Sequence, residues 1–418
     1  MTNGFAVLTI AGRKQDGDVD ILAQRLCLST NADRQLNMRL FANESANLCL
    51  EAMSITDQSS KTKKPIQQQQ QIQTDTIETN LFLDRSSHIR DDEAIMKDLY
   101  NRLDSLHVLL RGTNEVMFAT TNELALPTLK DIIEDESLIS LFNTGSVDAT
   151  TQEDILKKRT FIGRIGEHQT PVFAAFLPKD ATYDGSYQSC YFGNTRSRAP
   201  LLNSLHNELA LTSTAYVNWQ NSHQFCCTCG APLKFIHGRT CAKCMGSKTH
   251  FHWPRQDPSI ICLVTNPSKT HALLARSPRH KPYLYTCLAG FVEAGETFES
   301  AVIREVYEEV GVNIDEHSIS YIASQPWPFP RSTMIGMHAR SSLDMAPICI
   351  DPNEIVDAQW FDKETVYQAA KHSDEIGAVL DPKVVEAKQA KGWNGKLLVP
   401  SKGVLARKLV DHWLDELT

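Results

Sequence analysis

The chain lacks the features of a membrane-spanning protein or of a protein that binds nucleic acid through bulk charge. No apolar run in its 418 residues approaches the length of a bilayer span. The short apolar segment at 5–11, FAVLTIA, has no basic residue before it and is followed by aspartates; we therefore expect neither a signal peptide nor a transit peptide. The net charge of −8 excludes bulk attraction to nucleic acid or to an anionic membrane. We expect an intracellular protein, cytoplasmic by default.

Cysteine is unevenly distributed along the chain. Five of the 11 cysteines fall within residues 226–244. A disulfide framework would spread its cysteines, whereas clustering in a reducing compartment is typical of metal binding. Two C-x-x-C pairs separated by eleven residues predict one structural Zn²⁺ held by four thiolates. The predicted zinc ligands are Cys226, Cys229, Cys241 and Cys244. The less favoured substitutes are Cys227, His237, His250 and His252.

The chain has no internal repeat, but one low-complexity stretch interrupts it. Residues 60–75, SKTKKPIQQQQQIQTD, combine lysines, a proline and glutamines. They predict a solvated linker, because nothing in them offsets the entropy of ordering. Short apolar runs bounded by turn residues predict strands of a mixed α+β domain over roughly 79–200, and 201–220 has the period of an amphipathic helix. Further strand candidates and a closing helix follow residue 255.

Residues 290–312, GFVEAGETFESAVIREVYEEVGV, place six glutamates among mostly small and apolar residues. On a helix of 3.6 residues per turn, Glu305, Glu308 and Glu309 stand at i, i+3 and i+4 and share one face. Carboxylates on one face repel each other unless cations lie between them, and hard divalent ions such as Mg²⁺ or Mn²⁺ suit oxygen ligands. A solvated acidic face is the simpler alternative. The fixed register and the glycine-bounded loop favour a metal site.

The same helix has predicted ends and a predicted buried side. Thr297 is a suitable N-cap and Gly311 a suitable C-terminal stop. Arg304 can anchor the preceding glutamate loop through a charge-assisted pair. A separate apolar stripe that can pack on a sheet comprises Val302, Val306 and Val310.

The spacing of glycines, glutamates and arginine in 290–312 resembles the signature of the Nudix hydrolases. This resemblance implies an α/β/α sandwich and hydrolysis of a nucleoside diphosphate linked to another moiety, with two or three Mg²⁺ or Mn²⁺ ions on the glutamates. Downstream, residues 324–332, SQPWPFPRS, alternate prolines with Trp327 and Phe329. The prolines hold the backbone extended, so both aromatics can stack on a flat heterocycle. Alone, this segment could be a surface loop or a partner-binding segment; beside the glutamates it resembles the mark of the NADH pyrophosphatase branch.

The resemblance extends from about 79 to 415 and implies how the chain is divided. That branch carries a zinc ribbon before its catalytic domain, in agreement with the two C-x-x-C pairs. The expected fold class is therefore α+β and α/β: a Nudix α/β/α sandwich preceded by a zinc ribbon and by an N-terminal Nudix-like α+β domain. The expected parts are an N-terminal extension, the linker, the N-terminal domain, the ribbon and the catalytic domain, at 1–59, 60–78, 79–220, 221–254 and 255–418.

The resemblance also implies which residues form the site. The implied catalytic residues are Glu305, Glu308 and Glu309, of which Glu308 is either a further metal ligand or the base. The implied ligands of Mg²⁺ or Mn²⁺ are the carbonyl of Ala289 and the carboxylates of Glu305, Glu309 and Glu354. The implied substrate contacts are Gln325, Pro326, Trp327, Pro328, Phe329, Pro330, Arg331, Ser332, Trp253 and Ala406. Trp253 stands where the family usually has a tyrosine, and a further arginine contact is either Arg196 or Arg198.

The expected activity is hydrolysis of the pyrophosphate bond of NADH or NAD to AMP and nicotinamide mononucleotide, by a homodimer with no membrane partner. Removal of an NAD cap from RNA is the alternative within the enzyme class, and a mildly basic ribbon permits it without requiring it. A non-catalytic nucleotide sensor is the alternative from another class. It is disfavoured because every carboxylate of the signature is present.

Overall fold

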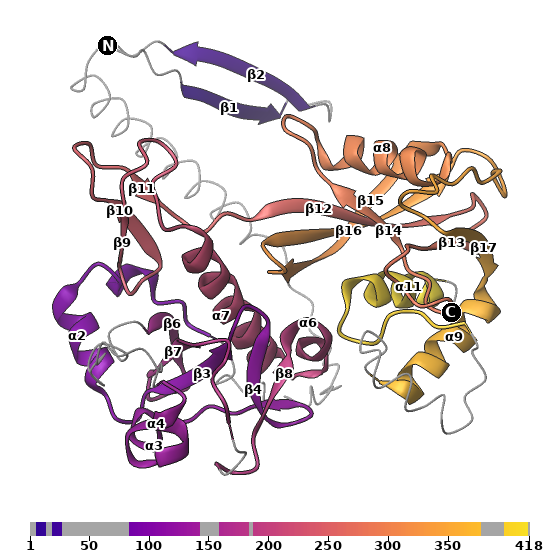
Figure 1. Ribbon diagram of the computed structural model, residues 1–418. Coiled ribbons are helices and arrows are strands. Elements are labelled where there is room, and N and C mark those ends of the chain that lie inside the picture. Colours follow the sequence, from indigo (N-terminus) through magenta and orange to yellow (C-terminus); the bar gives the residue numbers. More distant parts are fainter. Residues whose placement is uncertain are drawn as a thin grey trace, which may run out of the picture. The chain divides into compact units, whose positions relative to one another are not determined.

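The computed structural model describes residues 6–13, 19–26, 83–142, 159–183, 187–377 and 397–416 (Figure 1). The chain divides into two compact units, Met1–Asp75 and Thr76–Thr418. In the first unit, β1 (Ala6–Arg13) and β2 (Val19–Leu26) form an antiparallel pair. The predicted linker at 60–78 lies outside the described residues.

The second unit begins with a six-stranded mixed sheet of order β5-β4-β3-β7-β6, in which β8 pairs with β4. Its strands are β3 (Leu106–Arg111), β4 (Glu115–Thr120), β5 (Glu123–Leu124), β6 (Thr160–Ile165), β7 (Thr170–Leu177) and β8 (Tyr191–Asn194). β3 and β7 run parallel, and the other pairs are antiparallel. The short apolar runs of this region therefore form strands, as their composition predicts.

Helices cover both faces of this sheet. They are η2 (Ser87–Ile89), α2 (Glu93–Asn101), α3 (Leu129–Glu134), α4 (Glu136–Ser140), α6 (Thr195–Arg198), η3 (Ala199–Leu201) and α7 (Ser204–Ser222). Side chains alternate along β3: Val108 packs in the cluster that includes α7, whereas Leu109 packs in the cluster that includes α3 and α4. This alternation is the period of two that a strand imposes.

Helix α7 is buried on more sides than the amphipathic helix predicted at 201–220. It begins after Asn203, whose side chain accepts a hydrogen bond from the His206 N–H. It lies between the sheet and the ribbon, because the Trp219 ring contacts Phe235 with centroids 5.4 Å apart. The buried Gln220 amide donates to Thr160 Oγ1 and to the Arg239 carbonyl, each at 2.8 Å. The helix therefore presents apolar surface to two partners.

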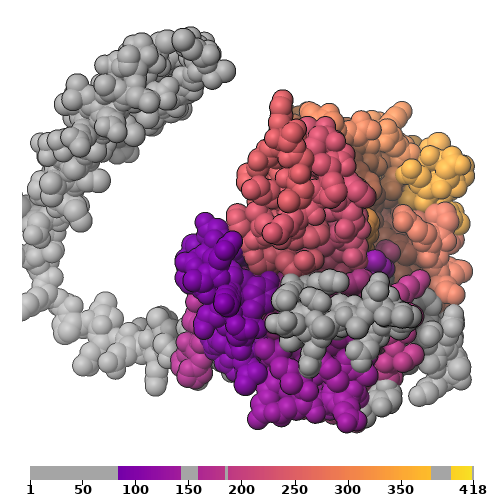
Figure 2. All heavy atoms as spheres, turned by 60° about the vertical axis from the view of Figure 1, so that its left-hand side comes forward, coloured from indigo at the N-terminus to yellow at the C-terminus, as the bar shows by residue number. Residues whose placement is uncertain are grey.

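The ribbon, predicted at 221–254, contains a three-stranded antiparallel sheet of order β11-β10-β9. Its strands are β9 (Leu233–Ile236), β10 (Cys241–Cys244) and β11 (Phe251–His252). The Phe161 N–H of β6 donates to the Gly238 carbonyl at 2.9 Å, so the ribbon is bound to the preceding sheet by backbone as well as by side chains. Figure 2 shows the ribbon in red, adjoining the indigo-to-magenta region on the face in view.

The last part contains a second six-stranded mixed sheet, of order β15-β16-β12-β13-β17, in which β14 pairs with β12. Its strands are β12 (Asp257–Thr265), β13 (His271–Arg276), β14 (Leu288–Phe291), β15 (Ile314–Trp327), β16 (Ser332–Ser341) and β17 (Asp357–Asp362). Here β12 and β16 are the parallel pair. Its helices are α8 (Phe298–Val310), α9 (Lys363–Ile376) and α11 (Leu405–Asp415).

This second sheet is covered by helices on both faces (Figure 1). Along β12, Ile261 and Leu263 pack in the cluster that contains α9 and α11. Ile260 and Cys262 pack in the opposite cluster, which contains the valines of α8. The α/β/α sandwich predicted for the catalytic domain is thus confirmed. None of the helices in the described part of the chain is both long and apolar enough to cross a membrane.

Candidate active site and metal-ligand clusters

Helix α8 begins and ends at the residues that its sequence indicates. Thr297 is the N-cap, and its hydroxyl accepts a hydrogen bond from the Ser300 N–H at 3.1 Å. Gly311 ends the helix in the left-handed region, at φ 69°. The buried stripe of this helix comprises Val302, Val306 and Val310. Because the stripe fixes the rotation of the helix against the sheet, the acidic face is fixed as well.

Two of the predicted carboxylates are nearly removed from solvent. Glu305 is 8% exposed and Glu309 is 7% exposed, whereas Glu308 lies on the open side of the helix. Gly290 makes room for Glu305: a Cβ at this glycine would lie 1.8 Å from Glu305 Cδ. The carbonyl of Gly290 in turn accepts a hydrogen bond from Ser259 Oγ at 2.9 Å. Because Gly290 has no side chain, strand β14 leaves space for the Glu305 carboxylate.

Glu354 joins this group from a loop 45 residues further along the chain. The Asp351 N–H donates to the Glu309 carbonyl at 3.0 Å, so the loop is attached to the end of α8. Burial, followed by the charges of Glu305 and Glu354, raises the pKa of Glu309 to about 8, although a hydrogen bond from the Ala289 backbone acts in the opposite direction. The structure thus places Glu305, Glu354 and the Ala289 backbone near Glu309, and their role as ligands of a divalent metal stays a prediction.

Arg304 holds the glutamate loop against the helix. Its guanidinium donates to both carboxylate oxygens of Glu296 at 2.8 Å and to the Phe291 carbonyl at 2.9 Å. It also donates to Glu305 at 2.8 Å and to Glu308 at 2.9 Å. The hydrogen bond from Arg304 lowers the pKa of Glu296. Glu296 therefore has a positioning role, and this arginine neutralises part of the acidic face.

The remaining charge fits a divalent cation. Glu309 Oε2 is buried and has no hydrogen-bond partner among the described residues. An unpartnered buried carboxylate oxygen beside two further carboxylates is costly unless a cation or a proton is shared between them. The donor set consists of carboxylate and carbonyl oxygens, which are the ligands that Mg²⁺ and Mn²⁺ prefer. The residues present therefore fit such an ion.

A cavity of about 650 Å³ is lined by the proline-rich segment. The rings of Trp327 and Phe329 meet edge to face, with centroids 5.3 Å apart. The strand registers place the cavity at the same end of the sheet as the glutamates. Asp257 of β12 stands opposite Ser332, which lines the cavity, and Ser259 stands opposite Phe291, which begins the glutamate loop.

Most of the predicted substrate contacts line this cavity. They are Pro326, Trp327, Pro328, Phe329, Pro330, Arg331 and Ser332. Gln325 instead joins β15 to α11, because its side chain accepts from the Leu405 N–H at 2.9 Å and donates to the Gly403 carbonyl at 2.8 Å. Ala406 is buried in the core, 2% exposed. Trp253 is 63% exposed and lies against Phe251, and the cavity lining includes its neighbour Pro254 rather than Trp253 itself.

The structure distinguishes between the two candidate arginines. Arg196 lines the cavity, and its guanidinium lies 5.6 Å from the centroid of the Trp327 ring. Arg198 instead lies over Tyr191, at 5.5 Å. Sequence reasoning missed other polar lining residues from the N-terminal region, which are Thr113, Asn114, Asn194 and Asn218. No local pattern marks them, because the fold alone brings them to residues more than a hundred positions away.

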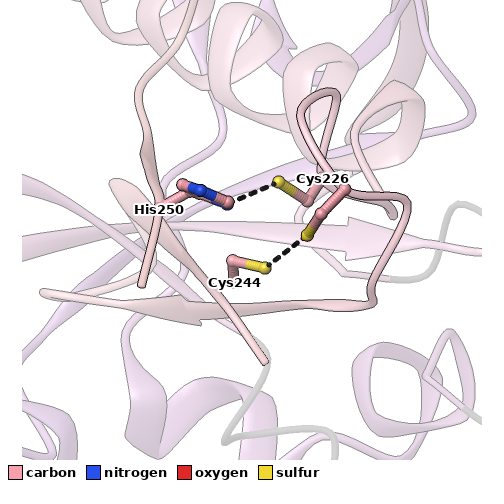
Figure 3. A group of neighbouring side chains, drawn as sticks. Cys226, Cys244 and His250 are labelled. Atoms are coloured by element: carbon pink, nitrogen blue, oxygen red, sulfur yellow. Dashed lines mark hydrogen bonds between the residues drawn. The ribbon is translucent and has the colours of Figure 1, made fainter. Parts of the chain in front are cut away.

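Three of the four predicted zinc ligands meet in the ribbon. Cys226, Cys229, Cys244 and His250 place their ligand atoms within 4.8 Å of one another (Figure 3). Cys229 Sγ and Cys244 Sγ are 3.3 Å apart, and Cys226 Sγ is 3.4 Å from His250 Nδ1. Four soft or borderline donors in one place suit a tetrahedral metal ion. His250, a less favoured substitute in the sequence, occupies the fourth position.

Cys241 lies outside this group. It and Cys244 begin and end strand β10, and side chains three positions apart on a strand point to opposite faces. Cys241 is 2% exposed, and burial raises the pKa of its thiol. The C-x-x-C spacing converges on a metal when it forms a tight turn, so the extended conformation of β10 accounts for the difference. The surplus thiol Cys227 has its sulfur 3.8 Å from His252 Nδ1.

Comparison with known proteins gives the family. Residues 255–381 match the NUDIX domain model. The human NAD-capped RNA hydrolase NUDT12 is 35% identical over 237 residues, which are 54% of this chain and 46% of that protein. The NAD-capped RNA hydrolase NudC of Stutzerimonas stutzeri is 46% identical over 149 residues, 36% of this chain and 51% of that protein. The NudC of Mycobacterium bovis is 32% identical over 255 residues, 60% of this chain and 74% of that protein.

This chain belongs to the Nudix hydrolase family, in its NADH pyrophosphatase branch. It spans about half the length of the human and Stutzerimonas relatives that it matches.

Proposed function

We propose that this chain is a divalent-metal-dependent hydrolase that splits the pyrophosphate bond of NADH or NAD into AMP and nicotinamide mononucleotide. The observation that carries the proposal is the pair of buried carboxylates Glu305 and Glu309 near the charge of Glu354, with Glu309 Oε2 buried and unpartnered among the described residues. Such a group has a strong affinity for hard cations, and a diphosphate brings the oxygens that complete their coordination.

The residues of the chain have separate roles in this reaction. Glu305, Glu309, Glu354 and the carbonyl of Ala289 would hold two or three Mg²⁺ or Mn²⁺ ions. Bound ions would offset the charge of the diphosphate and lower the pKa of an attacking water. One P–O bond to the bridging oxygen breaks as the water oxygen bonds to phosphorus. Glu308, which is exposed and held by Arg304 at 2.9 Å, is placed either to ligate or to accept the proton of that water.

The cavity supplies the binding site for the heterocycles of the substrate. Trp327 offers a π face, and base–aromatic stacking contributes about 1–3 kcal/mol. Arg196 lies over this ring and adds positive charge beside it. Arg331, whose side chain is paired with Asp257 at 2.7 Å, lines the same cavity. Together they suit a dinucleotide whose rings stack while its phosphates extend towards the glutamates.

The direct test is to incubate the purified chain with NADH and either Mg²⁺ or Mn²⁺ and to separate the products by chromatography. The expected result is equal amounts of AMP and reduced nicotinamide mononucleotide, with neither formed when the divalent ion is omitted. Absence of AMP with both ions, from protein whose circular dichroism indicates a folded chain, would discard the proposal. The remaining hypothesis would then be a non-catalytic nucleotide sensor.

A second candidate function is removal of an NAD cap from RNA. It is favoured by the names of the relatives, because NUDT12 and both NudC proteins are called NAD-capped RNA hydrolases. The same bond would be cut, so the same glutamates would act. Turnover on free NADH and on NAD-capped RNA at several salt concentrations separates the two. A substrate held through its RNA chain would lose affinity steeply with salt, whereas a free dinucleotide would not.

The proposal includes a structural Zn²⁺ in the ribbon, held by Cys226, Cys229 and Cys244 together with His250. The closed arrangement of four protein ligands supports a structural role.

The resemblance further supports a homodimer and an intracellular, cytoplasmic protein. Sedimentation of the purified chain tests the first, and fractionation of cells that express it tests the second.

A further inference from the structure

A third group of metal-ligating side chains lies apart from both the glutamates and the ribbon. His338 of β16, His412 of α11 and Glu416 at the end of α11 place their ligand atoms within 4.8 Å of one another. Glu416 Oε1 is 3.6 Å from His412 Nδ1 and 4.0 Å from His338 Nδ1. The two imidazole rings are 5.1 Å apart, at an angle of 77°.

A hydrogen bond fixes the tautomer of His338 that can bind a metal. His338 Nε2 donates to the Leu409 carbonyl at 2.9 Å, which leaves Nδ1 of the neutral ring with its lone pair towards Glu416. Burial lowers the pKa of His338, which favours that neutral ring. Metal-binding histidines commonly donate their other ring N–H in this way, which fixes the tautomer and the ring orientation.

Glu416 is oriented by a second partner. Lys269 Nζ donates to its Oε2 at 2.7 Å, while Oε1 faces the two histidines. The carboxylate is therefore shared between a cation on one side and two imidazoles on the other. Lys269 stays outside the ligand group, so a metal could enter without displacing it.

The spacing is close to what a small transition metal requires. Around a tetrahedral ion with bonds of about 2.0–2.1 Å, ligand atoms lie about 3.3 Å apart. The observed separations from Glu416 Oε1 exceed this by less than 1 Å. His412 and Glu416 are both exposed at the C-terminal end of the last helix, so both side chains can close around an ion.

We propose that His338, His412 and Glu416 form a binding site for a borderline divalent transition metal such as Zn²⁺, distinct from the ribbon and from the glutamates of α8. Two imidazoles and one carboxylate are a common protein ligand set for this ion. His338 and Glu416 line a cavity of about 290 Å³ together with His317, Ser318 and Arg340, which leaves room for a ligand at the fourth position. Water or a small anion can occupy that position. The bound ion would join the end of α11 to β16 and so fix the last helix on the sheet.

The test measures Zn²⁺ binding to the full chain after the ribbon has been loaded with one equivalent. Excess Mg²⁺ occupies the oxygen ligands of α8, and it competes poorly for imidazole. Calorimetric titration with further Zn²⁺ should then show one additional equivalent bound. Co²⁺ in place of the added Zn²⁺ should give visible absorption bands without the thiolate charge-transfer band of a cysteine site.

Substitutions locate the additional equivalent. His412→Gln, a change at an exposed position, should weaken it at least tenfold, and His338→Gln should do the same if the variant folds. His317→Gln is the matched control, because this histidine lines the same cavity but lies outside the ligand group; it should leave the affinity unchanged. The proposal is overturned if the wild-type chain takes up no further Zn²⁺, or if His412→Gln binds it with unchanged affinity.

Discussion

The acidic helix and the ribbon both contain candidate metal ligands, but they differ in how much buried apolar surface stabilises them. Helix α8 is anchored by a valine stripe that is fully buried, so its position does not depend on an ion. The ribbon leaves large apolar side chains in solvent: Phe225 is 65% exposed, Met245 59% and Phe251 46%. Its three short strands bury little apolar surface of their own. We therefore expect a metal on α8 to serve the proposed reaction and a metal in the ribbon to serve the fold.

The largest expected effect is on turnover and comes from α8. Glu309→Gln removes one carboxylate from the group while keeping the shape of the side chain. We expect turnover of NADH to fall by roughly 10²–10³, the size typical of losing one electrostatic stabiliser. The melting temperature should not fall, because the substitution also removes repulsion from Glu305 and Glu354. Product formation and thermal unfolding are measured on the same preparation.

The matched control for this variant is Glu299→Gln, on an exposed position in the first turn of the same helix. It should leave turnover within a factor of two, because Glu299 lies away from the carboxylate group. Equal losses in both variants, or none in Glu309→Gln, would contradict the assignment of the acidic face.

Helix α8 shows which features of the site can be predicted from the local sequence and which depend on the fold. The ends of α8 follow from its cap residues Thr297 and Gly311. Its valine stripe and the shared face of Glu305 and Glu309 follow from the period of 3.6 residues. The hollow at Gly290 was not predictable, because it depends on how closely β14 approaches the helix. The attachment of Glu354 likewise depends on a loop that binds the end of α8 through backbone hydrogen bonds. Family resemblance, rather than spacing, indicated Glu354.

The next effect is on stability and comes from the ribbon. Cys244→Ser should lose the bound zinc and lower the melting temperature by on the order of 10 °C, since a structural metal contributes several kcal/mol. His250→Ala should weaken zinc binding as well. Cys241→Ser should keep a full equivalent of zinc and cost only about 1 kcal/mol, as a small buried side chain outside the ligand group. Elemental analysis and thermal unfolding give both quantities.

This series decides between two ligand sets. If Cys241→Ser loses its zinc and His250→Ala keeps it, the four cysteines predicted from the spacing bind the metal, and β10 must then turn between its two cysteines. If every one of these variants loses activity at unchanged stability, the division into a catalytic and a structural metal is wrong.

The ribbon and the cavity show where sequence reasoning stops. The C-x-x-C spacing identifies a metal site but does not state whether the intervening residues turn or extend. In β10 they extend, so Cys241 and Cys244 point apart. The cavity lining is equally hidden, because Arg196 reaches Trp327 across the boundary between two sheets. The sequence offered Arg196 and Arg198 as equals, and only the fold separates them.

A smaller effect tests whether binding can be separated from turnover. Trp327→Ala removes the stacking face in the cavity and should raise the KM for NADH roughly tenfold, in keeping with 1–3 kcal/mol per stacked base. The kcat should change little, because the glutamates are untouched. Arg196→Ala should act in the same direction, and Arg198→Ala is its control. A fall in kcat with unchanged KM would place Trp327 in the reaction rather than in binding.

The smallest effect concerns the response of the acidic helix to pH when no Mg²⁺ or Mn²⁺ is added. Burial beside Glu305 and Glu354 raises the pKa of Glu309 to about 8 in the folded chain, above the ordinary value of about 4.3 in the unfolded chain. Between these values the folded state holds a proton that the unfolded state has lost. The free energy of unfolding should therefore fall as pH rises through this window, by at most about 1.4 kcal/mol per pH unit.

Two additions sharpen this last prediction. Glu309→Gln should flatten the slope, because the substituted amide does not titrate. Adding Mg²⁺ should oppose it, because a bound cation favours the ionised carboxylates. The ribbon should contribute nothing to this Mg²⁺ dependence, because thiolates and imidazole select other metals. Urea unfolding of the wild-type chain and of Glu309→Gln at pH 5.5 and 7.5, with and without Mg²⁺, measures the pH slope, its change on substitution and the effect of Mg²⁺. A stability that rises with pH in the absence of added metal would mean that the carboxylates of α8 are already neutralised by the protein itself.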